Sequence, residues 1–477
     1  MEKLYILIFL LTFSSIQQIK GQQVYNIPNN LKDSNRSIKD AFTIANQDTK
    51  NLTLFIGDHK TLNVYIYDKE MNRLDELSSV GLPNRYDEIL GYIQKENRTI
   101  LFLKHRNNKE FGAIVYDFKS NETKEIQFDI KFKNEEFVEV LSKNNKFYII
   151  SVEEKSSKIN FYEFGGISYN KHTIHLDYNF RIERNQPQTL HQMLSVSEGL
   201  GSNLEIEKIE NYLPVSVQMA SSMNKFYETT NGFDLSLDKS IYETYIVSVD
   251  VNSYEYQIHQ FEKPKYSSTE TFYGNSFLLD NNIFQLVANS DELYFQVINR
   301  ESRESLKKLT LKKDESIDFK NSPIIQDKEG DIYAPHRELE KTSKFLRKID
   351  NENIAISVYK VGFGYQITMG SYNEIKQGGP MMMGMPGMSM SMGGGFGLVA
   401  SAYFSYSYGK SVRIECLFDE QFRHLDGKPR KNIFDKIKDY AEVLQNNDTA
   451  ETVFEWNNDV YYGYYSSITE SYRLIKF

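Results

Sequence analysis

The chain has 477 residues, enough to bury a large core, and its single cysteine, Cys416, excludes a disulfide within the chain. The formal net charge of −9 at pH 7 argues against general binding to the phosphate backbone of nucleic acids. Tyrosine and phenylalanine occur 33 and 31 times, which favours β-strands, whereas Trp456 is the only tryptophan and argues against repeats that use one in every unit.

The first residues predict a secretory signal peptide over residues 1–21. Lys3 gives a positive start, residues 4–13 are almost wholly apolar, and Gly21 offers a small residue before Gln22. The alternative is a membrane anchor, but the run is shorter than the ~20 apolar residues that span a bilayer, and no later stretch qualifies. We therefore expect a secreted or periplasmic mature chain, residues 22–477, without a transmembrane segment.

A short apolar motif recurs along the N-terminal part of the chain. Residues 53–56 are echoed by residues 100–103 and 147–150, at intervals of 47 residues. A second landmark, an aromatic residue before an acidic one, closes an apolar run in each unit: Tyr67-Asp68, Tyr116-Asp117 and Tyr162-Glu163. A period near 47 built from alternating runs and turn residues is typical of a propeller blade of four antiparallel strands.

The chain thus resembles secreted or periplasmic bacterial β-propeller repeat proteins, most clearly over residues 38–176 and 273–312, without the motifs of a named family. The resemblance implies one all-β domain over residues 22–477. We expect seven units, beginning near residues 38, 86, 135, 213, 273, 344 and 450. The last unit has room for three strands, and residues 24–27 would supply the fourth and close the ring. Six units is the alternative, because a helix over residues 337–349 would replace the start of the sixth unit.

Pairs of asparagines predict tight turns between the first two strands of several units. Asparagine tolerates positive φ, which a two-residue hairpin turn requires. The pairs are Asn144-Asn145, Asn281-Asn282 and Asn457-Asn458.

Four long insertions interrupt the later units, at about residues 177–212, 313–343, 361–410 and 426–449. The expected strand order places all four on one face of the propeller, over its central channel. Long loops on one face favour a functional role. Residues 432–445 carry apolar side chains at helical spacing, so they predict a helix that covers the seam between the sixth and seventh units.

The third insertion contains seven of the 13 methionines, interleaved with glycines and Pro386 between Tyr-rich flanks at 365–372 and 398–408. One interpretation is a hairpin tip that contacts a partner through adaptable side chains: Tyr365, Tyr372, Met381, Met382, Met383, Phe396, Tyr403 and Tyr406. A second is a Cu(I) site of soft thioether ligands: Met385, Met388, Met390 and Met392. A third is a low-complexity tip without a ligand.

No nucleophile elbow, zinc motif or phosphate-binding loop is present in the sequence, so we predict neither catalytic residues nor a cofactor. The leading hypothesis is a non-enzymatic binding or scaffolding protein of the cell envelope or exterior, with an unknown protein or glycan partner. The alternatives are an enzyme acting on glycans or peptides, and Cu(I) handling. Carboxyl groups with raised pKa at the channel mouth would favour the enzyme, and an apolar Tyr- and Met-lined roof would favour binding.

Overall fold

The computed structural model describes residues 22–29, 40–46, 49–57, 61–80, 86, 88–95, 97–105, 110–182, 186–198, 201–210, 213–264, 272–327, 336–362, 364–373, 411–442, 444 and 448–477. This part of the chain is mostly β-structure, in many small sheets whose strands pair antiparallel except for β18 with β19. The predicted all-β class is confirmed.

Seven sheets of four or five strands are present in the described residues. The first three sheets follow the chain without interruption: β2 (Asp40–Ala45), β3 (Leu52–Gly57), β4 (Thr61–Tyr67) and β5 (Arg73–Val80); β6 (Glu88–Lys95), β7 (Arg98–Lys104), β8 (Phe111–Asp117) and β9 (Glu122–Phe128); β10 (Glu135–Lys143), β11 (Lys146–Glu153), β12 (Lys158–Phe164) and β13 (Tyr169–His175). The second strand of each of these sheets, β3, β7 and β11, is buried along almost its whole length, as expected for a strand covered on both faces.

The later sheets include strands from the insertions. The fourth and fifth are β18 (Glu207–Ile209), β19 (Asn224–Glu228), β20 (Gly232–Leu237), β21 (Glu243–Asp250) and β22 (Tyr256–Glu262); and β23 (Tyr273–Leu279), β24 (Asn282–Ala288), β25 (Glu292–Asn299) and β26 (Ser305–Lys312). The sixth and seventh are β28 (His336–Leu339), β27 (Ile324–Asp327), β31 (Ser411–Asp419), β30 (Gly364–Tyr372) and β29 (Asn353–Val361); and β1 (Gln22–Pro28), β34 (Ser471–Lys476), β33 (Asp459–Ser466) and β32 (Asp448–Trp456).

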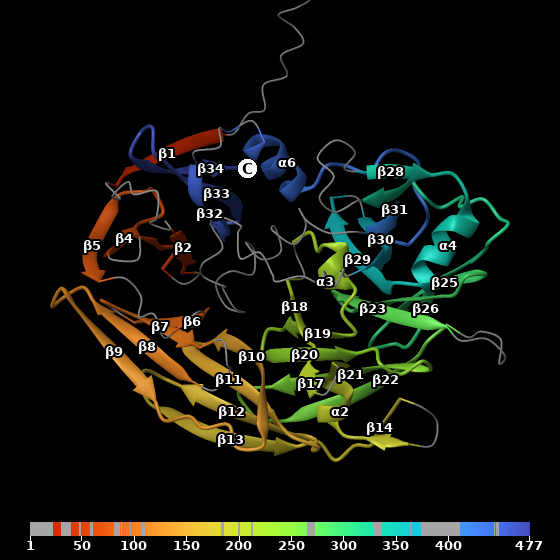
Figure 1. Cartoon of the computed structure of the whole chain (residues 1–477), viewed down its shortest axis with the longest axis horizontal. Helices are drawn as coiled ribbons and strands as arrows, with labels where there is room; N and C mark the ends of the chain where they lie inside the picture. The colour runs from red at the N-terminus through yellow and green to blue at the C-terminus, as the bar shows by residue number, and fades with distance from the viewer. Residues whose placement is uncertain are drawn as a thin grey trace, which may run out of the picture.

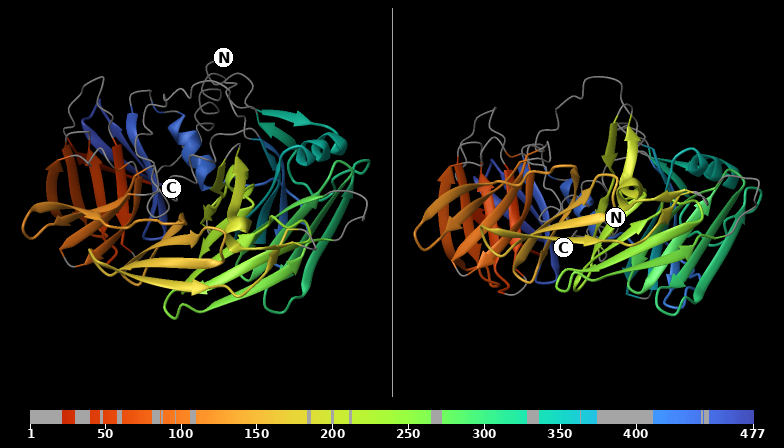
Figure 2. Two further views of the ribbon diagram at one scale, coloured as in Figure 1. Left: turned by 60° about the horizontal axis from the view of Figure 1, so that its bottom comes forward. Right: turned by 90° about the horizontal axis from the view of Figure 1, so that it is seen from below.

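Smaller elements lie between these sheets. Two hairpins occur in the first insertion: β14 (Phe180–Arg181) with β15 (Pro187–Gln188), and β16 (Ser195–Glu198) with β17 (Gly201–Leu204). The helices are α2 (Leu190–Leu194), α3 (Val217–Ala220), α4 (Thr342–Asp350) and α6 (Ile433–Ala441). In Figure 2 the β16–β17 hairpin and α4 lie on the same side of the sheets.

The sheets follow one another around a common centre, with β6, β10, β18 and β32 facing it (Figure 1). Aromatic pairs join consecutive sheets. Their ring centroids lie 5.4 Å apart for Phe55–Tyr116, 4.1 Å for Phe102–Phe147, 6.3 Å for Phe161–Phe233, 5.9 Å for Tyr227–Phe277 and 5.9 Å for Phe284–Tyr365. The core is therefore a series of contacts between sheet faces, to which each aromatic pair adds more than its buried area alone.

The two ends of the described chain share one sheet. Strand β1 pairs antiparallel with β34, with Val24 opposite Ile475 and Ile27 opposite Tyr472. The predicted pairing of residues 24–27 with the last unit is confirmed. This pairing covers an edge of β34 that would otherwise present free backbone groups.

The sixth sheet differs from the sequence-based expectation. Its strand next to β31 is β27, with Ile325 opposite Arg413, so residues 313–343 contribute to the sheet and are more than a surface insertion. The alternative helix predicted over residues 337–349 is present in part as α4, directly before β29, whereas residues 336–339 form β28. Helix and sheet thus coexist, because β29, β30 and β31 supply three strands without the residues of α4.

Two of the three asparagine turns lie where predicted. Asn144 and Asn145 have φ of 53° and 56°, and Asn457 and Asn458 have φ of 52° and 65°. The third lies one residue earlier than predicted: Leu279 pairs with Asn282, so the turn consists of residues 280 and 281, with φ of 51° at Asp280. Aspartate shares the short polar side chain that makes this conformation accessible.

The predicted helix over residues 432–445 is α6, and it ends at Ala441. The Asn432 side chain accepts hydrogen bonds from the backbone N–H groups of Phe434 and Asp435, at 2.9 and 3.1 Å, and so caps the helix. Phe434 and Ile437 are fully buried, and the Tyr440 ring lies edge-on to that of Phe477 at 5.6 Å. The helix therefore packs against the end of the seventh sheet.

Phe434 and Ile437 belong to one apolar cluster with Ile414 of the sixth sheet and Tyr462 of the seventh. Burial raises the pKa of Glu415 on β31, and the nearby carboxylate of Asp435 on α6 raises it further. These contacts place α6 at the predicted seam.

Candidate functional site

Charged side chains from four sheets gather near the centre of the ring. We call them the central charged cluster: Glu88, Lys104, Glu139, Lys143, Glu207, Lys208, Glu210, Glu228 and Glu455. These residues belong to β6, β7, β10, β19 and β32 and to the short segment at β18. Figure 1 shows the positions of these strands around the centre. Six of these groups are carboxyl groups and three are amino groups, and Glu205 and Lys225 also act on Glu207, so the cluster carries excess negative charge when all are ionised.

Lys208 is the buried lysine of the cluster and is only 4% exposed. Its Nζ donates to the carbonyl oxygen of Val140 at 3.0 Å and forms an ion pair with Glu228 at 2.6 Å. Burial opposes the charged form of Lys208, but the carboxylates of Glu228 and Glu139 outweigh it and raise the pKa. Lys208 therefore remains an ammonium ion and anchors the surrounding carboxylates.

The second and third sheets supply the neighbouring charges. Lys104 pairs with Glu88 at 2.8 Å, and its Nζ lies 4.3 Å from the centre of the Phe137 ring. Burial raises the pKa of Glu139, against the attraction of Lys208. A carboxyl group held in this way resists ionisation.

Glu207 and Glu210 also have strongly raised pKa values. Burial, with repulsion from Glu139, raises the pKa of Glu207 to about 7. Burial, with repulsion from Glu228 and Glu455, raises the pKa of Glu210 to about 7. Both are partly exposed, so they can meet a ligand or exchange protons with solvent near neutral pH.

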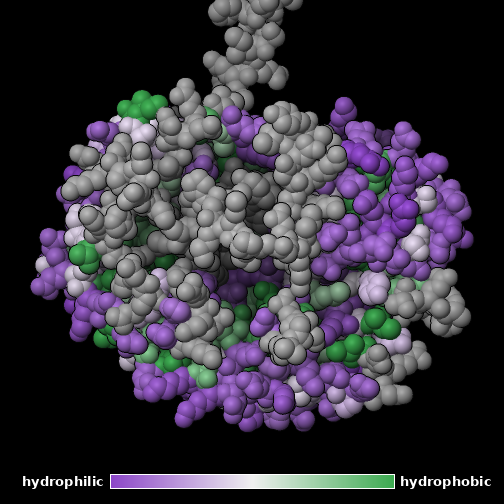
Figure 3. All heavy atoms as spheres, in the orientation of Figure 1, coloured by the Kyte–Doolittle hydropathy of each residue, from purple (hydrophilic) through white to green (hydrophobic). Residues whose placement is uncertain are grey.

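The face shown in Figure 3 is hollowed near its middle, where hydrophilic surface is visible below the rim. The inner strands that carry the cluster surround this part of the molecule in the same orientation (Figure 1). The described surface visible in this hollow includes both hydrophilic and hydrophobic residues.

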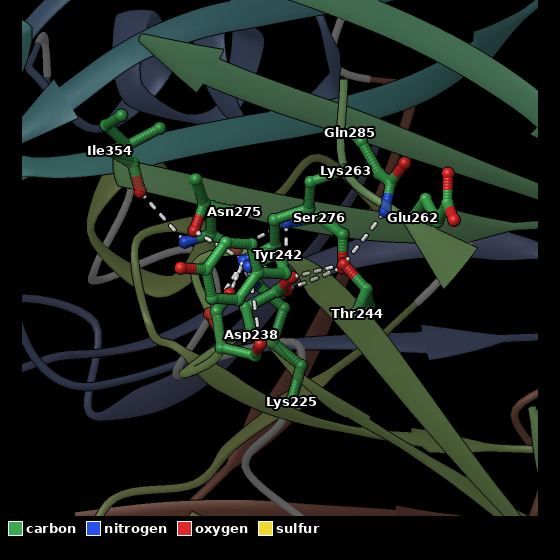
Figure 4. A network of polar contacts seen from close by, with 12 residues as sticks. Lys225, Asp238, Tyr242, Thr244, Glu262, Lys263, Asn275, Ser276, Gln285 and Ile354 are labelled. Atoms are coloured by element: carbon green, nitrogen blue, oxygen red, sulfur yellow. Dashed lines mark hydrogen bonds and ion pairs between the residues drawn. The ribbon is translucent and has the colours of Figure 1, made fainter. Parts of the chain in front are cut away.

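A second polar network lies buried between the fourth and fifth sheets (Figure 4). Lys225 Nζ donates to Asn275 Oδ1 at 2.5 Å and to the carbonyl oxygen of Ser222 at 2.6 Å. Lys263 Nζ donates to the carbonyl oxygens of Asp238 and Ser240, both at 2.7 Å. Burial lowers the pKa of Lys225 to about 8, against the attraction of Asp238.

The carboxylate of Asp238 is satisfied inside this network. Its oxygens accept from the hydroxyl groups of Ser276 and Thr244, both at 2.6 Å, and from the Ser276 backbone N–H at 2.9 Å. Asp238, Lys225 and Lys263 are all buried. The network joins the fourth and fifth sheets, and its Lys225 also interacts electrostatically with Glu205 and Glu207.

The structure describes two of the residues predicted to contact a partner. Tyr365 is 7% exposed and its ring stacks on Phe422 at 5.0 Å, so it belongs to the core. The predicted start of the insertion at residue 361 is wrong, because residues 364–372 form β30 between β29 and β31. Tyr372, at the other end of β30, is partly exposed. The remaining predicted residues lie outside the described part of the chain: Met381, Met382, Met383, Met385, Met388, Met390, Met392, Phe396, Tyr403 and Tyr406.

Sequence reasoning missed the central charged cluster. Its only signal is the run of charges at 205–210, inside a segment predicted to be an insertion. The parallel pairing of β18 with β19 brings this run to the centre, and no local pattern predicts that pairing. Among the described residues, no group of three or more His, Cys, Asp or Glu side chains is arranged to hold a metal ion. No described helix is long and apolar enough to cross a bilayer.

Comparison with known proteins adds little. No protein-family model and no curated protein matches the chain. Among solved structures, a prolyl endopeptidase aligns with 90% of this chain and 46% of its own at 7% identity and a TM-score of 0.37. A Synechocystis apocarotenoid oxygenase variant covers 60% and 68% at 8% identity and a TM-score of 0.29. A Bacteroides caccae protein of unknown function covers 83% and 95% at 8% identity and a TM-score of 0.25. TM-scores this low carry no conclusion about the present chain.

Proposed function

We propose that the chain is an exported β-propeller of seven blades whose central charged cluster binds a basic segment of a partner protein. The seven sheets around a centre, with the two chain ends in one sheet, support this architecture. The observation that carries the function is the excess of carboxyl groups over amino groups on the inner strands.

Repulsion among these carboxylates makes the empty cluster unfavourable at neutral and higher pH. A lysine or arginine side chain of a partner would relieve the repulsion and donate hydrogen bonds to several carboxylates. The negative field would also steer a basic segment toward the centre. Binding of this kind needs no catalytic motif, in agreement with the absence of one from the sequence.

Fluorescence anisotropy with a labelled Lys-rich peptide and a matched Gln-rich peptide tests this proposal. The Lys-rich peptide should bind at pH 8, and the double variant Glu207→Gln/Glu210→Gln should bind it about tenfold more weakly, since two charge contacts are worth roughly 1.4 kcal/mol together. The matched control is Glu122→Gln/Glu301→Gln, which removes two exposed carboxylates outside the cluster. Equal loss in both double variants, or equal binding of both peptides, would contradict a specific central site.

The second candidate is an enzyme acting on glycans or peptides. It is favoured by the raised pKa values of Glu207 and Glu210, both about 7, which suit a general acid near neutral pH. Incubation with mixed glycans and peptides, followed by mass spectrometry, would reveal products. The single variants Glu207→Gln and Glu210→Gln should each abolish such products while keeping the fold. The control variant Glu122→Gln should still form the products.

The methionine-rich segment remains a proposed partner contact or Cu(I) site. Its residues lie outside the described part of the chain. A cross-linked pull-down from intact cells, comparing the full chain with a variant lacking residues 377–397, would identify a partner that depends on the segment. Titration of both proteins with Cu(I) would test the thioether ligands separately.

A further inference from the structure

A cavity of about 440 Å³ opens between the end of α4, the start of β29, the end of β30 and β23. Its lining includes Tyr273, Asp350, Asn351, Asn353 and Tyr372. The volume lies in the range of small-molecule sites. None of these residues belongs to the central charged cluster, so the cavity is a separate feature of the molecule.

The wall of the cavity is held in place by hydrogen bonds from behind. The carbonyl oxygen of Ile354 accepts from Asn275 Nδ2 at 2.8 Å, which ties the start of β29 to the buried network of Figure 4. Glu352, whose side chain is only 7% exposed, accepts from the Ser371 hydroxyl at 2.8 Å and lies 3.9 Å from Lys348. The polar groups at the wall are therefore positioned before any ligand arrives, which lowers the entropic cost of binding.

The lining combines two kinds of chemistry. Asp350 and Glu352 bring carboxylates, and Asn353 and Asn373 bring amides, which accept from and donate to hydroxyl groups. The Asn351 side chain already donates to the carbonyl oxygen of Arg347. Tyr273 is 46% exposed and, with Tyr372, offers an aromatic surface beside them. Planar polar side chains next to an exposed aromatic ring suit a ligand with many hydroxyl groups on one side and a C–H surface on the other.

We infer that this cavity binds a neutral saccharide. An apolar ligand would leave the carboxylate and amides without partners, at a high desolvation cost. An anionic ligand is disfavoured because the carboxyl groups of Asp350 and Glu352 line the cavity. The saccharide would stack on Tyr273 and exchange hydrogen bonds with Asp350 and Asn353.

A microarray printed with neutral mono- to hexasaccharides tests the inference, followed by isothermal titration calorimetry with the saccharide that binds best. We expect binding to a defined subset, weakened about five- to tenfold in Tyr273→Ala and in Asn353→Ala. Tyr273 is the exposed aromatic residue of the site, so its removal should leave the thermal unfolding midpoint unchanged. Ile468→Ala, at another strongly exposed apolar position, is the matched control and should bind as the unmodified protein does.

Absence of binding to any printed saccharide would overturn the inference, as would binding that Tyr273→Ala and Asn353→Ala leave unchanged. The variant Glu207→Gln/Glu210→Gln separates this site from the central one. It should retain saccharide binding, and Tyr273→Ala should retain binding of the Lys-rich peptide. Loss of saccharide binding in the Glu207/Glu210 variant alone would place the saccharide at the centre and contradict the assignment to this cavity.

Discussion

The indole N–H of Trp456, on β32 of the seventh sheet, donates a 2.9 Å hydrogen bond to the backbone carbonyl of Lys50, just before β3 of the first sheet. The two residues are 406 positions apart in the chain. Leu52, Leu54 and Ile56 pack in the same cluster as Trp456 and Tyr472. The first and last sheets thus form one interface, and the single tryptophan lies at that junction.

Deletion of residues 1–29 should destabilise the protein strongly, compared with deletion of residues 1–21 alone. The longer deletion removes β1 and exposes the edge of β34, whose free N–H and C=O groups invite pairing between chains. Size-exclusion chromatography should show aggregation and calorimetry a lower unfolding midpoint. Equal behaviour of the two truncated proteins would show that the seventh sheet is stable with three strands.

The central charged cluster should make stability depend on pH. The raised pKa values of Glu207 and Glu210, about 7 against an ordinary value of 4.5, mean that the folded state binds more protons than the unfolded state between these values. Their contribution to the free energy of unfolding should therefore fall as pH rises from about 4.5 to about 7.

The double variant Glu207→Gln/Glu210→Gln tests this pH dependence by urea unfolding. At pH 8 it should exceed the unmodified protein in stability by about 1 to 3 kcal/mol, because it removes the repulsion, and the difference should vanish near pH 4.5. Glu122→Gln/Glu301→Gln should change stability little at either pH. A destabilised double variant at pH 8 would mean that the two carboxylates make favourable contacts in the folded protein.

Asn275→Ala should cost about 3 kcal/mol or more of the free energy of unfolding. The change removes the acceptor for the buried Lys225 ammonium and the donor to four carbonyl oxygens, including that of Ile354. Lys313→Met breaks an exposed ion pair with Asp291 and should cost at most about 1 kcal/mol. Similar costs for the two variants, measured by chemical unfolding, would rule out a special role for the buried network.

Helix α6 should contribute to stability through its buried face and its cap. Phe434→Ala should cost about 3 to 5 kcal/mol, because it leaves a cavity at a fully buried position. Asn432→Ala removes the hydrogen bonds to Phe434 and Asp435 and should cost about 1 kcal/mol. Thermal unfolding of both variants would check this order, and a near-zero effect of Phe434→Ala would show that α6 detaches before the sheets unfold.

Local features of the fold were predictable from the sequence. Alternating apolar runs predict strands because side chains on a strand alternate between its two faces, and the turns at Asn144 and Asn457 follow from the tolerance of asparagine for positive φ. Apolar residues at helical spacing after Asn432 predict α6 for the same kind of local reason. The pairing of β1 with β34 was predictable because the last unit lacked a strand.

The sequence by itself therefore determined the β-class, the repeat and most turns, each of which depends on residues close together in the chain. Only the tertiary structure decided that β27 joins β31, that β18 runs parallel to β19, and that Glu139, Glu207, Glu210 and Glu455 approach one another. These features depend on contacts between residues far apart in the chain, whose pairing no local pattern encodes. The candidate site follows from these long-range contacts, because its charged residues come from several sheets and no single sheet contains all of them.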